Sequence, residues 1–471
     1  MLFGVFLSEA QQIDIVDFKS LQTQLVILPD SAKVYGTVNY AFEILKNTDS
    51  IYIDAINMKF SEVFIDNKKV AFHNDLKKVW LKSSFKKNEV YNLTLKYVAY
   101  PKKALYFVKH NNDWQIWTQG QGKYTSHWLP SIDDMNDKME FDLSIRYDKT
   151  YEVIANGKLT HKKINDSTVQ WHYDMQKPMS SYLVALAIGK YNKKELTSTR
   201  GIPIELYYYP EDSSKVEPTY RYTKEMFDFL EKEIGVPYPW QSYKQVPVKD
   251  FLYSGMENTS LTIFSDDFMI DKMSFIDKNY VNVNAHELAH QWFGNLVTET
   301  DGKHHWLQEG FATYYALLAE RAIFGDDYYY WQLYTYTQEL LAQEKANQAT
   351  ALLDPKASST TFYKKGAWAL HMLKEKVGDR CFKKAVKNYL EKYAFKNVTT
   401  KDFITVVETV SGQDLTAFIN QWLLSKVLPV DAMYVSLFKN ALIKDYEAIN
   451  CNIDDCKKSF QKPFPLELKK K

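Results

Sequence analysis

The sequence predicts an α+β protein in which an antiparallel β half is followed by a mainly helical half. The chain has 471 residues, enough for two or three domains that each bury a core of their own. From about residue 21 to residue 209, many stretches alternate apolar and polar residues, which favours strands. Near Pro210 the period of the apolar residues changes, and helical spacing follows.

The β half is predicted from four stretches that alternate in polarity or are rich in β-branched and aromatic residues. These stretches are 33–45, 89–100, 138–147 and 202–209. Clusters of turn-forming residues, such as 46–50 and 65–68, separate the strands. We therefore expect this half to be mostly antiparallel β.

The helical half is predicted from apolar residues that recur at helical spacing. The expected helices are 222–234, which Gly235 and Pro237 end, then 275–296, 307–324, 362–377 and 415–424. The expected organisation is an N-terminal segment (1–20), a β domain (21–200), a helical domain (201–430) and a short helical, Lys-rich tail (431–471).

Composition excludes several classes of protein. Hydrophobic residues make up 45% of the chain, charged residues 25%, and the net charge is +1. These values exclude a disordered chain and give no basic excess for binding nucleic acid. No apolar run reaches the ~18 residues of a membrane-spanning helix, so we expect no integral membrane segment.

The N-terminal residues predict export. Residues 2–7 are apolar and precede Ser8-Glu9-Ala10, like the end of a signal peptide that lacks its basic start. This favours a periplasmic or secreted protein over a cytoplasmic one, and the alternative is an ordinary hydrophobic segment. Cys451 and Cys456 would pair in an exported protein or stay free thiols.

The stretch from His286 through Glu287 to His290, with Glu309 nineteen positions later, predicts a metal site. Residues four apart share one helix face, so both imidazoles can reach one ion, and Glu287 lies about 100° round the axis. Two His and one Glu hold Zn²⁺ with a fourth position open for water, whose pKa falls toward ~7. We expect one Zn²⁺ per chain.

Chance gives this short pattern in roughly one such chain in a hundred. It would then mark two partly buried helix histidines bonded to backbone or carboxylate groups. A polar, Gly-containing stretch at 298–302 predicts a turn between antiparallel helices. Such a turn would return Glu309 to the histidines.

Residues 286–298 and 306–314 resemble the signature of the aminopeptidase N-like zinc metallopeptidases, a gluzincin-type family that includes the leukotriene hydrolase. The spacing from His290 to Glu309 is similar to theirs. The resemblance covers roughly residues 20–430. It implies a saddle-like β domain followed by a thermolysin-like catalytic domain, with His286, His290 and Glu309 as zinc ligands.

Three further segments resemble motifs of the same family. Gly255-Met256-Glu257-Asn258 resembles its exopeptidase motif, and Tyr363 with Lys365-Gly366 resembles its Tyr-x-Lys-Gly segment. Residues 118–121 resemble a segment of its β domain that supplies a second amine-binding residue, here Gln121.

The resemblance and the chemistry of the residues assign compatible roles. Glu287 is expected to be the general base for the attacking water, and Tyr363 to donate a hydrogen to the oxyanion. Glu257 is expected to pair with the substrate's ammonium and Gln121 to add a neutral acceptor. Gly255, Met256 and Asn258 complete the expected substrate-binding segment.

Some residues depart from the family pattern. Gln308 stands where an Asn is usual, and Ala316 stands where many members have an acid, so a partner of a zinc ligand is absent or is replaced by Glu320. His304 and His305 are interpreted as turn residues, because the ligand set is complete without them. About forty residues follow Pro429, where the family continues into a further domain, so the chain is a minimal form or a fragment.

The sequence therefore predicts a zinc metallo-aminopeptidase that hydrolyses the N-terminal residue of peptides. Two alternatives are a catalytically impaired peptide-binding homologue and a relative with different chemistry, either epoxide hydrolysis or endopeptidase cleavage. The expected partners are peptides with a free N-terminus. The sequence indicates neither the preferred side chain nor the oligomeric state.

Overall fold

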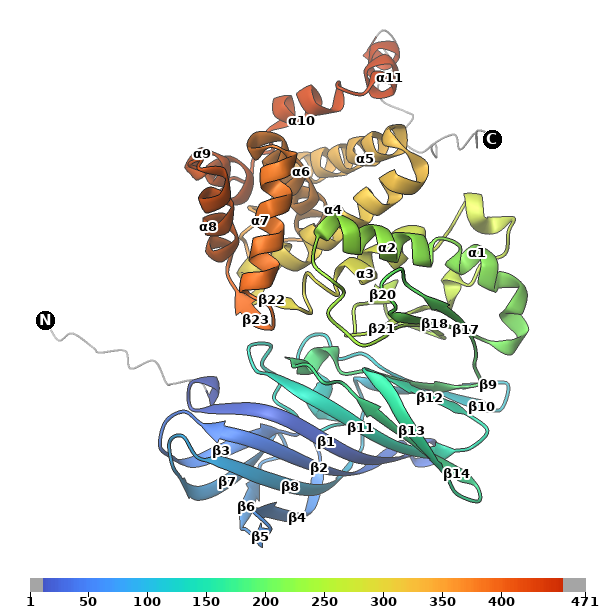
Figure 1. Ribbon diagram of the computed structural model, residues 1–471, viewed down its shortest axis with the longest axis vertical. Helices are drawn as coiled ribbons and strands as arrows, with labels where there is room; N and C mark the ends of the chain where they lie inside the picture. The colour runs from blue at the N-terminus through green and yellow to red at the C-terminus, as the bar shows by residue number, and fades with distance from the viewer. Residues whose placement is uncertain (1–11, 452–471) are drawn as a thin grey trace, which may run out of the picture. The chain divides into compact units, whose positions relative to one another are not determined.

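The computed structural model describes residues 12–451, which divide into two compact units (Figure 1). Within the described residues, the first unit comprises 12–195, 203–210 and 240–266, and the second comprises 196–202, 211–239 and 267–451. The first unit is built mainly of strands and the second mainly of helices. The predicted order, a β domain followed by a helical catalytic-type domain, is confirmed. Pairing is mostly antiparallel, but the strand that the stretch 202–209 contributes pairs in parallel with residues 243–245.

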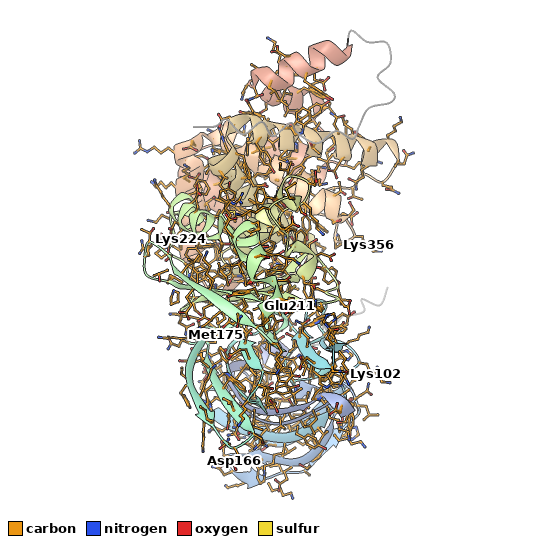
Figure 2. All side chains as sticks on the ribbon, turned by 90° about the vertical axis from the view of Figure 1, so that its right-hand side faces the viewer. Lys102, Asp166, Met175, Glu211, Lys224 and Lys356 are labelled. Atoms are coloured by element: carbon orange, nitrogen blue, oxygen red, sulfur yellow. The ribbon has the colours of Figure 1, made fainter. Side chains whose placement is uncertain are left out.

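The largest sheet of the first unit has nine strands and includes one parallel pair. Its order is β13-β14-β11-β1-β2-β8-β4-β5, with β15 beside β11. Strands β1 and β11 run parallel, and the other pairs are antiparallel. The bounds are β1 Val16–Leu28, β2 Lys33–Ile44, β4 Lys59–Ile65, β5 Lys68–Lys69, β8 Val90–Ala99, β11 Lys138–Asp148, β13 Lys158–Ile164, β14 Thr168–Asp174 and β15 Met179–Ser180. Asp166, labelled in Figure 2, is exposed in the turn that joins β13 to β14.

Alternation of polarity explains how these strands pack. Along β1, Leu21 and Leu25 are buried, whereas Gln22 and Gln24 are exposed. Side chains of a strand point alternately to the two faces of its sheet, so one face is apolar and forms the core. This period of two is the signal from which the strands were predicted.

Smaller sheets complete the first unit. One has the order β3-β7-β6 and another the order β12-β16-β10-β9. A five-stranded sheet has the order β17-β18-β19-β21-β20. The bounds are β3 Thr48–Asp54, β6 Phe72–Asn74, β7 Lys78–Phe85, β9 Leu105–His110, β10 Asp113–Thr118, β12 Glu152–Ala155, β16 Leu186–Gly189, β17 Asn192–Thr197, β18 Pro203–Tyr208, β19 Tyr243–Val248, β20 Gly255–Met256 and β21 Leu261–Ser265.

The second unit is organised around α4, Trp306–Phe324, which contacts α3, α5 and α6. Every side chain of α4 from Trp306 to Glu320 is buried, as expected of a helix with neighbours on all sides. The remaining elements are α1 Val216–Tyr220, α2 Thr223–Ile234, α3 Val281–Ala289, α5 Asp326–Lys345, α6 Gly366–Val377, α7 Asp379–Lys392, α8 Thr400–Ser411, α9 Thr416–Phe418, α10 Val430–Leu437, α11 Ala441–Cys451, β22 Val297–Glu299 and β23 Lys396–Val398.

The observed helices differ from the predicted ones at several ends. Helix α2 ends as expected at Gly235, whose φ of 75° lies in the left-handed region that glycine adopts easily. The predicted helix 275–296 is wrong in extent, because α3 covers only Val281–Ala289. The predicted helix 362–377 contains a π-helical turn, Thr360–Lys365, before α6 begins.

Several expectations concern parts of the chain outside residues 12–451. The apolar N-terminal stretch, Cys456 and the Lys-rich end lie there, so export stays a prediction, and both alternatives for Cys451 and Cys456, pairing and free thiols, stay open. Within the described part, none of the helices combines the length and apolarity that crossing a membrane requires.

Candidate active site

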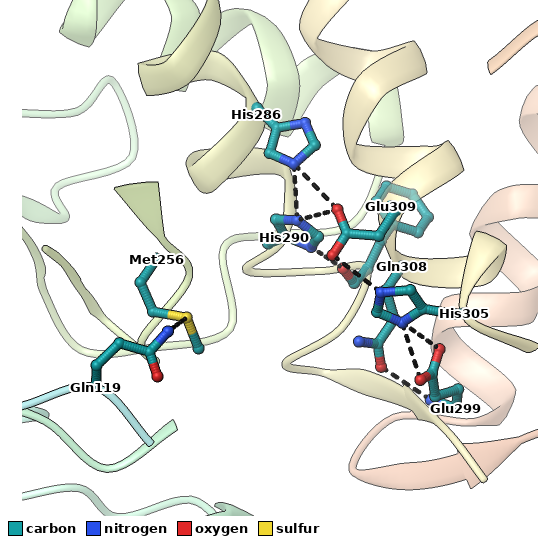
Figure 3. A network of polar contacts seen from close by, with 9 residues as sticks. Gln119, Met256, His286, His290, Glu299, His305, Gln308 and Glu309 are labelled. Carbon is teal, nitrogen blue, oxygen red and sulfur yellow. Dashed lines mark hydrogen bonds and ion pairs between the residues drawn. The ribbon is translucent and has the colours of Figure 1, made fainter. Parts of the chain in front are cut away.

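Helix α3 and the first turn of α4 bring the three predicted metal ligands together. Nε2 of His286 lies 3.0 Å from Nε2 of His290. Oε2 of Glu309 lies 3.2 Å from the first of these atoms and 3.3 Å from the second. The three atoms thus form a nearly equilateral triangle (Figure 3).

The triangle has the size that a tetrahedral zinc site requires. Ligand atoms about 2.0–2.1 Å from a tetrahedral Zn²⁺ lie about 3.3 Å from one another. The set offers two imidazole nitrogens and one carboxylate oxygen, all donors that zinc accepts. These residues therefore fit a zinc ion by both chemistry and spacing.

The local fold explains why His290 presents Nε2. Its Nδ1 lies 2.8 Å from the carbonyl oxygen of Phe293, to which an Nδ1 hydrogen is donated. That hydrogen bond fixes the tautomer and leaves the Nε2 lone pair directed at the triangle. Gly294 has a φ of 125°, which a side chain would disfavour, and it takes the chain away from α3 at this point.

The chain between the two ligand helices is more structured than predicted. A simple turn at 298–302 between antiparallel helices was expected. Instead, Val297–Glu299 forms β22, which pairs in parallel with β23, and a 3-10 turn follows at Gly302–His304. The expected turn is wrong because β23, about a hundred residues later in the sequence, pairs with this segment through backbone hydrogen bonds.

The ring of His286 stacks on an aromatic ring. Its ring lies parallel to that of Tyr363, with centroids 5.3 Å apart and planes 7° apart. Tyr363 belongs to the π-helical turn Thr360–Lys365, a type of distortion often found at functional sites. Over residues 12–451 the structure shows no hydrogen bond to Nδ1 of His286.

Glu320 does not replace the acid that Ala316 lacks. Its carboxylate accepts hydrogen bonds from Asn282 Nδ2 at 2.8 Å and from the Tyr328 hydroxyl at 2.9 Å. Burial raises the pKa of Glu320 to about 7, against the effect of these two donors. The bonds of Glu320 to Asn282 and Tyr328 thus do not support it as the replacement.

Sequence reasoning missed His305. The residue was interpreted as part of a turn, yet its Nε2 lies 3.5 Å from Oε1 of Glu309, and its Nδ1 lies 3.0 Å from Oε1 of Glu299 (Figure 3). His305 precedes Glu309 by four residues, a spacing that places two side chains on one helix face. That spacing in the sequence could have indicated that His305 lies next to Glu309.

The charges around Glu309 favour its ionised form. Burial opposes ionisation, but His290, His286 and His305 together hold the pKa of this carboxyl well below its usual range. Burial lowers the pKa of His286, against the effect of Glu309. An ionised carboxylate beside a neutral imidazole is the protonation state in which both groups can bind a metal.

Glu287 lies beside the triangle. It is buried on α3, and one of its carboxylate oxygens is within 4.8 Å of a ring nitrogen of His290. The structure therefore places a carboxylate next to the ligand set, as its position on the helix predicted.

The remaining predicted residues belong to the first unit. Gly255 and Met256 form β20, and Glu257 and Asn258 follow it as buried residues. Asn258 donates to the carbonyl oxygen of Leu183 at 3.4 Å.

Gln121 is held by a neighbouring glutamine. Its backbone N–H donates to Oε1 of Gln119 at 2.6 Å. Nε2 of Gln119 in turn donates to the sulfur of Met256 at 3.3 Å (Figure 3). The first unit thus ties the 118–121 segment to the segment that contains Glu257.

Two glycines let α4 and α6 approach closely. A Cβ on Gly366 would lie 2.8 Å from Cα of Gly310, and a Cβ on Gly310 would lie 3.0 Å from Cα of Gly366. Gly310 follows Glu309, and Gly366 lies three residues after Tyr363. The contact therefore fixes the backbone beside two residues of the site.

We expect Gly366→Ala to lower the melting temperature by about 4–8 °C, because the new methyl group forces two helix backbones apart at a cost of roughly 2 kcal/mol. Gly302→Ala is a matched control, since its Cβ would meet only ordinary contacts near 3.9 Å. Thermal unfolding followed by circular dichroism measures both. Equal melting temperatures for the two variants would contradict this role for Gly366.

Comparison with known proteins agrees with this geometry. Residues 219–422 match the Peptidase family M1 domain, and residues 19–183 match the Peptidase M1 N-terminal domain. The chain belongs to the M1 peptidase family. This confirms the predicted kinship with aminopeptidase N-like enzymes, and the two matches follow the predicted order of a β domain and a catalytic-type domain.

Related M1 proteins include longer chains. The chain is 27% identical to the leucyl aminopeptidase of Saccharolobus solfataricus over 441 residues, covering 90% of this chain and 56% of that one. It is also 27% identical to human glutamyl aminopeptidase over 320 residues, covering 64% of this chain and 33% of that one. The chain thus spans about half or less of the length of these relatives.

A solved structure with a similar fold is that of an M1 zinc metallopeptidase from Deinococcus radiodurans. It is 21% identical, its TM-score is 0.75, and the match covers 88% of this chain and 95% of the other. Another solved structure, a two-domain M1 zinc metallopeptidase bound to L-tryptophan, gives a TM-score of 0.76 at 21% identity, with coverage of 88% and 96%. These matches confirm the M1 fold.

Proposed function

We propose that this chain is a zinc-dependent aminopeptidase that removes N-terminal residues from peptides. The observation that carries the proposal is the triangle of His286 Nε2, His290 Nε2 and Glu309 Oε2, with sides of 3.0–3.3 Å. The aminopeptidase names of the M1 relatives support it. Zn²⁺ bound by these residues would act as a Lewis acid on the scissile carbonyl and make the attacking water more acidic.

Glu287 is the proposed general base. Its carboxylate would accept a proton from the attacking water and then transfer it to the leaving amine. The buried position on α3, within 4.8 Å of a ring nitrogen of His290, supports this role.

Tyr363 is the proposed donor to the oxyanion. Its ring is held by the stack on His286, which restricts the motion of its hydroxyl. A positioned donor is worth more to the transition state than to the ground state, because negative charge develops on the carbonyl oxygen only as the water attacks.

We expect Tyr363→Phe to reduce kcat by about 10²–10³ with little change in zinc content, since only the hydroxyl is removed. Steady-state kinetics with an aminoacyl-p-nitroanilide, together with elemental analysis, measures both quantities. Tyr330→Phe removes a partly buried hydroxyl elsewhere in the same unit and is the control. Equal losses of activity in the two variants would contradict the proposed role.

Glu257 is the proposed binding group for the substrate's ammonium. A carboxylate that pairs with a free N-terminus gains a charge-assisted hydrogen bond. An internal or blocked peptide has no ammonium, so it would not form this charge-assisted bond and would bind less tightly. The burial of Glu257 supports this, because the difference in binding is large only for a poorly hydrated group.

We expect Glu257→Gln to reduce kcat/KM for free peptides by roughly 10²-fold or more, mostly through KM, because the ammonium then meets a neutral group. Glu195→Gln, which alters an exposed carboxylate of the first unit, is the control. Initial rates over a range of peptide concentrations give both parameters. An unchanged KM would remove Glu257 from this role.

A panel of aminoacyl-p-nitroanilides, assayed with and without a chelator, tests the proposed function. The proposal predicts hydrolysis that the chelator abolishes and added Zn²⁺ restores. Hydrolysis that survives complete removal of the metal would overturn it. The same panel identifies the preferred side chain.

A further inference from the structure

His305 lies between two carboxylates, one of which is a predicted metal ligand. Its Nδ1 is 3.0 Å and 3.1 Å from the two carboxylate oxygens of Glu299. Its Nε2 is 3.5 Å from Oε1 of Glu309. Figure 3 shows these contacts as one line of side chains that leads from Glu299 through His305 to Glu309.

The two oxygens of Glu309 face different partners. Oε2 faces the two histidines of the triangle, whereas Oε1 faces His305. A carboxylate can bind a metal through one oxygen or through both, and the two modes give different coordination numbers. An N–H of His305 directed at Oε1 favours binding through Oε2 alone, because it competes with the metal for Oε1.

Glu299 is well placed to orient the imidazole. It lies in β22, its backbone N–H donates to Oε1 of Gln308 at 3.1 Å, and its carbonyl accepts from Asn397 Nδ2 at 2.9 Å. Its carboxylate is buried, and both of its oxygens face Nδ1 of His305. A carboxylate anchored at its backbone and bonded to Nδ1 fixes the plane of the ring.

Packing confines the ring of His305 as well. The ring meets that of Phe362 edge to face, with centroids 5.0 Å apart and planes at 90°. His305 directly precedes α4, so its backbone is set by the same helix that carries Glu309. The imidazole thus has a fixed backbone, a fixed plane and a fixed partner on each nitrogen.

We infer that Glu299 and His305 are positioning residues that hold Glu309 so that only Oε2 is presented to the metal. This inference rests on the metal-binding role in the proposed function and adds the means by which this chain orients its carboxylate ligand. Within residues 12–451, His286 has no hydrogen bond at Nδ1 that would fix its ring. The orientation of the three candidate ligands therefore depends more on the residues that hold Glu309.

The test uses the full chain and three variants. His305→Phe keeps a ring against Phe362 but removes both ring nitrogens. Glu299→Gln keeps the shape of the side chain and removes its charge. His304→Phe is the matched control. His304 is the neighbouring histidine, but its Nδ1 bonds to Thr400 Oγ1 at 3.0 Å instead of to Glu299.

Two measurements report on the metal independently of turnover. Competition with a chelator of known affinity gives the dissociation constant for Zn²⁺. Visible absorption of the Co²⁺-substituted chain gives the coordination number, because four-coordinate Co²⁺ absorbs more strongly than five-coordinate Co²⁺.

We expect His305→Phe to weaken zinc binding by about 10–100-fold and to lower the Co²⁺ absorption, and Glu299→Gln to cause smaller changes in the same direction. His304→Phe should leave zinc affinity within about threefold of wild type. Wild-type affinity and an unchanged Co²⁺ spectrum in folded His305→Phe overturn the inference. If that variant does not fold, the same result in Glu299→Gln overturns it.

The outcome for the wild-type chain separates this inference from the proposed function. A wild-type chain that binds no stoichiometric zinc contradicts the proposed function, and the positioning role falls with it. A wild-type chain that binds zinc, together with variants that bind it equally well, contradicts the positioning role alone.

Discussion

The variant His290→Ala is expected to hold no stoichiometric zinc and to lose at least about a thousandfold in kcat/KM. His290 supplies one corner of the 3.0–3.3 Å triangle, and two remaining ligands do not make a stable catalytic zinc site. Zinc contributes several kcal/mol to the transition state, and each 1.36 kcal/mol is a factor of ten in rate. Elemental analysis after dialysis and steady-state kinetics measure the two losses.

The control for this variant is His73→Ala, which alters an exposed histidine on β6 in the first unit. It should retain the zinc content and activity of the wild-type chain. One zinc per chain in His290→Ala, or equal activity in the two variants, would show that His290 is not a ligand.

The variant Glu287→Gln is expected to keep its zinc and to lose about 10²–10⁴ in kcat. The amide has nearly the same shape as the carboxylate but cannot accept the proton of the attacking water, so only the chemical step suffers. KM should change little, because binding of the substrate does not depend on this proton transfer. The measurement is kcat and KM for an aminoacyl-p-nitroanilide on chains whose zinc content has been determined.

Glu391→Gln is the matched control, since Glu391 is an exposed carboxylate on α7 of the same unit. It should behave as wild type. If Glu287→Gln loses its zinc, the residue helps to hold the metal, and if it keeps wild-type kcat, another group is the base.

The fold order and the two candidate histidine ligands could be predicted from the sequence because both depend on local periodicity. Strands such as β1 alternate with a period of two, and His286 and His290 share one face of a single helix. The spacing to Glu309 follows from a family signature. None of these inferences required knowledge of distant contacts.

The features that were missed depend on contacts between distant segments. Strand β22 exists because β23 pairs with it, so a turn was predicted instead. The glycines Gly310 and Gly366 matter because two helices cross at them, which no local pattern reveals.

Some of the missed features had a local signal. The buried residues of α7 recur three to four positions apart, and His305 precedes Glu309 by one helical turn. A search for residues four positions before each proposed ligand would have found His305. Helix α5 is harder, because its five tyrosines and one tryptophan are residues that also favour strands.

Because residue 316 is alanine and not an acid, the contacts around the candidate ligands differ from those that the resemblance implied. Glu320 is engaged by Asn282 and Tyr328, so His286 relies on the Tyr363 ring and on the triangle itself. In contrast, Glu309 is surrounded by groups that stabilise its charge. In this structure the predicted carboxylate ligand thus faces three histidines, whereas His286 has two polar neighbours and one aromatic neighbour.

The most direct test of the account uses one preparation and two peptides. The purified chain is supplied with Zn²⁺ and dialysed, its metal content is determined, and it is then incubated with the same peptide in free and N-acetylated forms. The account predicts one zinc per chain, release of the N-terminal residue from the free peptide and no cleavage of the acetylated one. A folded chain without stoichiometric zinc that leaves both peptides intact would contradict it.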